Sequence, residues 1–265
     1  MKNYKEYKTI AVDRRDRILY LTMNRPDVLN ATDAVMHTEL SKIFYDVADD
    51  EDADVVILTG AGKAFCAGGD TRWMQDMIDE PALWRRTVRE AKKIVFGLLD
   101  LEKPVIAKLN GHAMGLGATI ALYCDIIYAS ERAKIGDPHV AVGFTAGDGS
   151  SAIWPYLIGF ARAKEYLMTG DPITAEKAAE MGLVNHCVPA DQLDAAVDAC
   201  ADKLAGGAIR AIQWTKMAVN ASLRPIVAAN IEASLALEGL SNFSADHQEG
   251  VSAFNEKREP QFKGK

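Results

Sequence analysis

Cysteine is scarce in this sequence, and its spacing points to no structural site. The 265 residues include four cysteines, which form neither a C-x-x-C pair nor any other metal-ligand spacing. We therefore expect no disulfide framework and no metal site. Chains without a disulfide framework are typical of reducing compartments, so the sequence predicts a cytoplasmic location.

Long apolar runs and an excess of basic charge are also missing. No apolar stretch approaches the roughly 18 residues of a membrane-spanning helix, and residues 1–17 are too charged for a signal peptide. The formal net charge is -7. Because nucleic acid binds to basic faces, we expect neither a membrane nor nucleic acid as a partner. An anionic small ligand remains compatible with this charge, since one local basic patch can attract it.

Nucleotide-binding motifs are absent from two glycine-rich loops, at residues 60–70 and 110–117. Neither loop has the G-x-G-x-x-G spacing of dinucleotide-binding turns, and no Gly-Lys is followed by Ser or Thr. Glycine lets a backbone N–H approach a ligand closely, and a helix N-terminus leaves N–H groups unpaired. Two such loops side by side could form an oxyanion hole around one carbonyl oxygen. The alternative is that both are only tight strand-to-helix turns.

What the sequence does contain is the composition of a globular protein, with 49% hydrophobic and 25% charged residues. Apolar runs alternate with helical patterns in the first part, which predicts an α/β fold with a parallel sheet built from crossover units. Thr32 is the expected N-cap of the first helix, which runs to about Val47. Strands are expected at residues 10–12, 18–23, 54–59, 105–111, 125–130 and 183–188, and further helices at 82–100 and 115–125.

After Asp148 the pattern becomes mostly helical. One predicted helix carries an apolar stripe composed of Ile226, Ala229, Asn230, Ala233, Leu237 and Leu240. We divide the chain into a core at residues 1–200, which holds the site, and a helical segment at residues 201–265. That segment is a candidate for docking on a neighbouring subunit.

Five stretches, in order, resemble the crotonase superfamily (the enoyl-CoA hydratase/isomerase family), and the resemblance covers nearly the whole chain. They lie at 24–31 (NRPDVLNA), 61–70 (AGKAFCAGGD), 103–130, 182–189 (GLVNHCVP) and 246–262. The resemblance implies a spiral of ββα units followed by a helical C-terminal trimerisation segment. It also implies a homotrimer or a hexamer made of two trimers.

In that family two backbone N–H groups bind the thioester carbonyl of an acyl-CoA. Carried over by position, the donors here are the N–H groups of Gly69 and Leu116, although the second position is more commonly glycine. Fixed donors favour the enolate, whose oxygen gains charge, and the loss of one donor typically costs about 10²–10³ in rate. Coenzyme A would enter as part of the substrate, with no separate cofactor.

The resemblance also assigns contacts with the substrate and with coenzyme A. Candidates for contact with the acyl substrate are Ala67, Gly68, Trp73, His112 and Thr119. Candidates for contact with coenzyme A are Arg25, Lys63, Phe262 and Lys263. Candidates to line the apolar pocket are Trp73, Met74, Met77, Trp84 and Trp154. Solvated surface charge is the alternative for Arg25 and Lys63, and packing in the core is the alternative for the apolar residues.

One departure from the family pattern affects the chemistry. Typical hydratases place two glutamates over the enoyl double bond, whereas the matching positions here are Thr119 and His139. A threonine hydroxyl can hydrogen-bond water but cannot act as a base near neutral pH. An imidazole can, because its ordinary pKa lies near 6.5. We therefore expect His139 to replace the catalytic glutamate.

Asp148 is the expected partner of His139. The stretch 146–159 (AGDGSSAIWPYLIG) resembles the diketone hydrolases related to oxocamphor hydrolase, in which a Pro-His pair and a Gly-Asp-Gly occur as they do here. An imidazole oriented by a carboxylate is a general base with a fixed tautomer. The alternatives are that His139 packs under its loop and that Asp148 caps a helix starting near Ser150. Asp137 is interpreted as a turn residue, and Asp70 as a residue that fixes the first loop.

Three functions are compatible with these residues. The first is an acyl-CoA-processing enzyme, a lyase of the hydratase/isomerase type that stabilises a thioester enolate. The second is a C–C bond hydrolase acting on a diketone or a β-keto acyl-CoA through His139 and Asp148. The third is a non-catalytic protein that binds coenzyme A. The remaining histidines, His37, His186 and His247, are interpreted as surface or packing residues.

Overall fold

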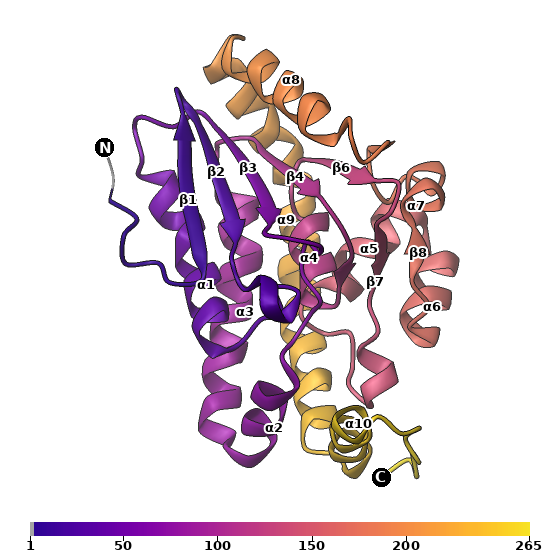
Figure 1. Cartoon of the computed structure of the whole chain (residues 1–265). Helices are drawn as coiled ribbons and strands as arrows, with labels where there is room; N and C mark the ends of the chain where they lie inside the picture. The colour runs from indigo at the N-terminus through magenta and orange to yellow at the C-terminus, as the bar shows by residue number, and fades with distance from the viewer. Residues whose placement is uncertain (1–2) are drawn as a thin grey trace.

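The computed structural model describes residues 3–265, which contain two sheets. The main sheet has the strand order β1-β2-β3-β4-β6-β9 (Figure 1). Its first two strands pair antiparallel and every later pair is parallel, which confirms the predicted crossover connections. These strands are β1 (Ile10–Arg15), β2 (Ile18–Met23), β3 (Val55–Gly60), β4 (Val105–Leu109), β6 (Ile126–Ser130) and β9 (His186–Val188). The second sheet, in the order β5-β7-β8, contains β5 (Ala113–Met114), β7 (Lys134–Gly136) and β8 (Ile173–Thr174).

Helices cover the sheets and fill the second half of the chain. They are α1 (Ala34–Ala48), α2 (Thr71–Asp79), α3 (Pro81–Asp100), α4 (Leu116–Leu122), α5 (Ser150–Ile158), α6 (Phe160–Thr169), α7 (Ala175–Met181), α8 (Leu193–Ala205), α9 (Ile209–Asn242) and α10 (Ala245–Glu256). Two short 3-10 helices are η1 (Pro26–Val28) and η2 (His139–Val142). In Figure 1 α9 runs from the α8 end of the molecule to α10, beside which the C-terminus lies. No helix among residues 3–265 is both long and apolar enough to cross a membrane.

The centre of the sheet is buried on both faces, which explains the unbroken apolar run of β3. Successive side chains of a strand point to opposite faces. Val56 and Leu58 join the main core, whereas Val55 and Ile57 pack in a second cluster with Val197 of α8. Alternation of polar and apolar residues is therefore absent from this strand, as is typical of parallel sheets.

The helix α1 begins one residue later than the sequence predicted. Its N-cap is Asp33, whose carboxylate accepts hydrogen bonds from the N–H groups of Val35 and Met36. Thr32, the predicted cap, is fully buried, and its backbone pairs with that of Gly68 and Asp70 instead. A carboxylate and a hydroxyl stand next to each other here, and either can cap a helix, so composition alone could not decide between them.

The apolar stripe noted on the last long helix marks its exposed face in the single chain. In α9 the buried positions include Val227, Ile231 and Glu238, whereas Leu237 and Leu240 are exposed. The helix is apolar on more than one face, so hydrophobic periodicity does not identify the face that packs on the core.

Candidate active site

The two glycine-rich loops lie side by side. The N–H of Met114 donates to the carbonyl oxygen of Cys66 at 2.9 Å, which joins the second loop to the first. Gly117 packs directly on Cys66, because a Cβ at position 117 would lie 2.6 Å from the Cys66 Cβ. Gly115 adopts a φ of 51°, a conformation that favours glycine. These glycines therefore allow the two loops to approach each other closely, and they also allow tight turns.

The early NRPDVLNA stretch anchors the first loop. Asn30 is fully buried, and its side-chain amide donates to the carbonyl oxygens of Ala61 and Ala64, each at 2.9 Å. Asp70 caps α2 by accepting from the N–H of Arg72 at 3.0 Å, which is compatible with the interpretation that it fixes the loop. The structure thus assigns this stretch a local positioning role.

Gly69 and Leu116 both line one inner cavity. Leu116 is the first residue of α4, so its N–H has no acceptor within the helix. On either side of Gly69, the Thr32 N–H donates to Gly68 and the Asp70 N–H donates to Thr32. The Gly69 N–H between them therefore points away from Thr32. Two backbone donors on one cavity are compatible with the predicted oxyanion hole.

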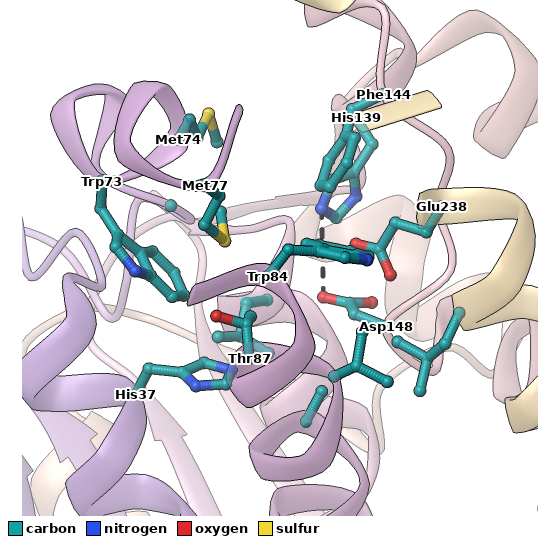
Figure 2. Close-up of a pocket in the computed structure, with 15 residues that line it drawn as sticks. His37, Trp73, Met74, Met77, Trp84, Thr87, His139, Phe144, Asp148 and Glu238 are labelled. Atoms are coloured by element: carbon teal, nitrogen blue, oxygen red, sulfur yellow. Dashed lines mark ion pairs between the residues drawn. The ribbon is translucent and has the colours of Figure 1, made fainter. Parts of the chain in front are cut away.

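His139 stands at one end of this cavity and is held by Asp137. The ring Nδ1 of His139 donates to Asp137 Oδ1, and the backbone N–H of His139 donates to the same oxygen at 3.3 Å. The other ring nitrogen, Nε2, lies 4.0 Å from Asp148 Oδ2 (Figure 2). The assignment of Asp137 as only a turn residue was therefore incomplete, because its carboxylate orients the imidazole. Asp148 faces the opposite side of the ring.

Asp148 is fixed by a buried hydroxyl network. The Thr119 hydroxyl donates to Asp148 Oδ1 at 2.8 Å and also lies 2.8 Å from Ser150 Oγ. The N-cap of α5 is Gly149, which has no side chain to cap the helix, but the Ser150 N–H donates to the Asp148 carboxylate. Asp148 therefore satisfies the first N–H of α5 as well as lining the cavity. Thr119 thus reaches the site through Asp148 and is not part of the cavity lining.

Glycine at position 147 brings a further carboxylate into the cavity. Ser234 of α9 donates its hydroxyl to the Gly147 carbonyl oxygen at 2.7 Å. A Cβ at position 147 would lie 2.6 Å from the Cβ of Glu238, so only glycine allows α9 this close. Glu238 is 4% exposed, lines the cavity, and has an Oε2 atom without a hydrogen-bond partner in the described chain. Sequence reasoning missed this residue.

Burial and charge set the protonation of this group. Burial lowers the pKa of His139, but the adjacent Asp137 carboxylate raises it to about 10. Burial raises the pKa of Asp148, an effect that the nearby His139 charge opposes. Burial and the charge of Asp148 raise the pKa of Glu238 well above its ordinary value. The imidazole is therefore a cation at neutral pH, surrounded by carboxyl groups of which two hold protons more tightly than usual.

The opposite end of the cavity contains His37, Trp73 and Thr87 (Figure 2). His37 is 2% exposed, and its Nδ1 lies 3.0 Å from Glu90 Oε2. The interpretation of His37 as a surface or packing residue omitted its place in the cavity wall. The other two histidines fit that interpretation, since His186 is exposed and His247 is buried.

Apolar side chains form much of the cavity wall. Trp73, Met74, Met77 and Trp84 line it as predicted. Trp154 does not, because it points into the core from α5 and is fully buried there. The inner cavity measures about 40 Å³, which suits a compact group.

An outer cavity of about 230 Å³ adjoins the inner one. Both are lined by Gly69, Met74 and His139, so a ligand can extend from one into the other. Further lining residues of the outer cavity include Ala67, Gly68, Phe254 and Arg258.

Comparison with known proteins identifies the family. Residues 13–265 match the enoyl-CoA hydratase/isomerase family. The chain belongs to this family. It is 35% identical over 262 residues to the crotonyl-CoA hydratase of Syntrophomonas wolfei, covering 97% of this chain and 98% of that protein.

Solved structures of the enoyl-CoA hydratase/isomerase family agree with this fold. An enoyl-CoA hydratase/isomerase from Mycobacterium paratuberculosis has a TM-score of 0.89 and 36% identity, covering 92% of this chain and 97% of that one. A β-diketone hydrolase from the cyanobacterium Anabaena sp. PCC 7120, bound to (S)-3-oxocyclohexyl acetic acid, has a TM-score of 0.84 and 33% identity. It covers 91% of this chain and 96% of that one.

In this hydratase/isomerase family member, several predicted contacts lie outside the two cavities. The Arg25 guanidinium is paired with Asp33 at 3.1 Å and Asp70 at 3.4 Å. His112 is exposed, and its Nδ1 accepts from the Lys134 N–H at 3.0 Å. Exposed positions without a place in either cavity lining are Lys63, Phe262 and Lys263.

The His139 group also has the spacing of a metal site. Asp137, His139 and Asp148 offer ligand atoms within 4.8 Å of one another. The hydrogen bond from His139 Nδ1 to Asp137 leaves Nε2 as the ring nitrogen that a metal could bind. A proton on the His139 ring balances part of the negative charge of the Asp137 and Asp148 carboxylates. The group can therefore also act as an acid–base cluster without a metal.

Proposed function

We propose that this family member hydrolyses a carbon–carbon bond of a compact β-diketone. The observation that carries the proposal is the composition of the inner cavity, where His139, Asp148 and Glu238 meet and the two hydratase glutamates are replaced by Thr119 and His139. Structural similarity to a β-diketone hydrolase of the same family supports it.

The first step is addition of water to one carbonyl. A carboxylate takes a proton from water, and the oxygen of the water forms a bond to the carbonyl carbon. Glu238 is the proposed base, because the residue lines the cavity and its Oε2 atom has no hydrogen-bond partner in the described chain. Its raised pKa makes the ionised form a stronger base but lowers the fraction of molecules that carry this form at neutral pH. The carbonyl oxygen becomes an oxyanion, which the N–H groups of Gly69 and Leu116 stabilise.

The second step breaks the carbon–carbon bond. The oxyanion collapses to a carboxylic acid, and the electron pair of the broken bond passes to the second carbonyl as an enolate. The enolate carbon then takes a proton from the His139 imidazolium. A proton moves from Glu238 back to His139, which restores both groups. His139 therefore acts as an acid in this proposal, not as the base that the sequence suggested, since its pKa of about 10 keeps it protonated. No metal or separate cofactor takes part.

The test uses a bicyclic 1,3-diketone whose ring opening gives 3-oxocyclohexyl acetic acid. We expect the purified protein to form this keto acid, with one oxygen of the new carboxyl group derived from isotopically labelled water. Loss of activity in His139→Ala is expected. Failure to open a panel of such bicyclic diketones, together with hydration of crotonyl-CoA at rates usual for hydratases, would overturn the proposal.

Acyl-CoA chemistry is the second candidate. The specific observation is the outer cavity, which continues from Gly69 toward Arg258 and could receive the part of a thioester that lies beyond its carbonyl group. In this case the Gly69 and Leu116 N–H groups would stabilise a thioester enolate. Turnover of any member of an acyl-CoA panel would favour this candidate. Binding of coenzyme A without turnover of thioester or diketone would instead indicate a non-catalytic protein.

A further inference from the structure

A buried histidine on α10 bonds to the segment between His139 and Asp148. His247 is fully buried, and its Nδ1 lies 2.7 Å from the carbonyl oxygen of Val142 at the end of η2. Because a carbonyl oxygen only accepts, Nδ1 is the protonated ring nitrogen. The other nitrogen, Nε2, has no hydrogen-bond partner in the described part of the chain. Phenylalanine would pack here without leaving a polar atom unpaired, so the feature that the imidazole adds is its Nδ1 donor.

The face of the His247 ring contacts a residue of the inner cavity wall. His247 stacks on Phe144 with ring centroids 4.4 Å apart and an interplanar angle of 17°. Phe144 lines the inner cavity, and its ring lies 5.5 Å from the His139 ring (Figure 2). The backbone N–H of Phe144 also donates to the His139 carbonyl oxygen at 2.9 Å. Phe144 therefore connects His247 to His139 through both its ring and its backbone.

Two glycines bring α10 into direct contact with this segment. Gly143 has a φ of 66°, and a Cβ at this position would lie 2.7 Å from the carbonyl oxygen of Asp246. A Cβ at Gly250 would lie 2.4 Å from the Val142 carbonyl oxygen, so only glycine allows the backbones this close. Among the described residues, no member of α10 lines the inner cavity. The helix therefore fixes residues 142–144 from outside that cavity.

His247 makes these contacts in its neutral form. Burial lowers the pKa of His247 and the charge of His139 lowers it further, although the hydrogen bond to Val142 opposes both effects. A protonated His247 would place a second buried cation near the His139 imidazolium, and its Nε2 proton would have no acceptor in the described chain. The neutral ring supplies one donor and one aromatic face without adding charge to the site.

We propose that His247 is a positioning residue that acts on His139 through Phe144. Its Nδ1–H fixes the backbone at Val142, and its ring face fixes the Phe144 ring beside the imidazole. Asp137 holds one edge of the imidazole, so contact with Phe144 limits the tilt that remains. The inference rests on the proposed function for the reaction that His139 serves. His247 itself lines neither cavity.

The test separates the two contacts of His247. His247→Asn removes the ring face and keeps a donor, because the asparagine amide nitrogen is as many bonds from Cα as Nδ1 is. His247→Phe keeps the ring face and removes the donor. We expect each variant to lower kcat for the diketone about tenfold, the effect of one aromatic contact or one hydrogen bond. His247→Ala removes both and should lower kcat about 100-fold. KM should stay unchanged, since His247 contacts no ligand.

A second measurement needs no turnover. The nuclear Overhauser effect between the ring protons of His139 and Phe144 reports whether the two rings stay together. We expect it to weaken in His247→Asn and His247→Phe, while amide signals from the main sheet keep their positions and show that the fold is retained. This measurement decides the inference even if no diketone is hydrolysed, so its failure is distinct from failure of the proposed function.

His186→Asn is the matched control. His186 also lies against an aromatic ring, with its centroid 4.4 Å from that of Tyr128, but it is exposed and lines neither cavity. This variant should keep both kcat and the Overhauser effect between His139 and Phe144. An Overhauser effect that is unchanged in every His247 variant would overturn the inference. A loss of kcat in His186→Asn equal to that in His247→Asn would overturn it as well.

Discussion

Asp137 accepts hydrogen bonds from both the backbone N–H and the ring Nδ1 of His139, two positions further along the chain. The residue between them is a proline, whose restricted backbone limits the motion of this short segment. The orientation of the imidazole is thus set locally, by three consecutive residues. The groups that surround its other nitrogen come from more distant parts of the sequence.

Replacing Asp137 tests this local control. Asp137→Asn keeps the size of the side chain and removes its charge, so the pKa of His139 should fall from about 10. A less protonated imidazole is a less available acid, and we expect diketone hydrolysis to slow by about 10²–10⁴-fold at neutral pH. Titration of the His139 ring signals by NMR measures the shift. An unchanged titration would contradict the assigned role.

The pH dependence follows from the same pKa. The acid form of His139 is required, so kcat should decline as the pH rises through about 10. The free energy of unfolding should also decrease as the pH rises over this range. The folded-state pKa lies above the ordinary 6.5, so the stabilisation is complete below about 6.5 and is lost as the pH rises through about 10. Rate profiles and urea unfolding across this range check both statements, and a rise in either quantity would be the opposite of what we expect.

Glu238→Gln should remove the proposed base without changing the packing of α9. We expect a loss of about 10²–10⁴-fold in kcat, since an amide cannot take the proton from water. Glu232→Gln is the control, because Glu232 lies on the same helix, is exposed and pairs only with Lys92 at the surface. Its activity should match that of the unmodified protein. Equal effects of the two substitutions would exclude a specific role for Glu238.

Thr119→Val should affect stability and the site together. The change removes the hydroxyl that donates to Asp148 and approximates the same shape. Leaving a buried carboxyl oxygen unsatisfied costs about 1–3 kcal/mol, which urea denaturation can measure. The pKa of Asp148 should rise further, because burial already raises it and the lost hydrogen bond had opposed this. Unfolding at the same urea concentration as the unmodified protein would argue against the hydroxyl network.

Metal removal distinguishes the two chemistries open to the His139 group. In the proposed reaction a proton, not a metal, balances the carboxylates of Asp137 and Asp148. Prolonged dialysis against EDTA should therefore leave diketone hydrolysis unchanged. Loss of activity with recovery on addition of Zn²⁺ would assign these residues to a metal site instead.

Local patterns predicted much of the fold. The strand pair at the start was placed by its short apolar runs, and the helix at 82–100 by its helical pattern, and both are present in the structure. Helix ends were less certain where two capping residues stood together, as at Thr32 and Asp33. Trp154 shows a similar limit, because nearness in sequence to the loop did not indicate that its ring would point into the core.

The candidate site was only partly visible in the sequence. His139 and Asp148 were found because they match positions that carry catalytic residues in related proteins. His37 and Glu238 belong to helices far from that loop, and only the three-dimensional packing of α1 and α9 places them on the same cavity. One signal was present for Glu238, a lone acidic residue within the apolar stretch LALEGL. Without the fold, that residue could equally face solvent.

The close packing of α9 on Gly147 has a consequence for how this protein can be altered. The proposed acid and the proposed base are encoded on opposite sides of residue 200, and hydrogen bonds that include the one from the Ser234 hydroxyl to the Gly147 carbonyl oxygen join the two segments. Grafting a foreign C-terminal segment onto the same core would exchange one half of the proton relay and retain the other. Such chimaeras offer a route to new reactions in which the His139 imidazole keeps its position in the core while the base is replaced.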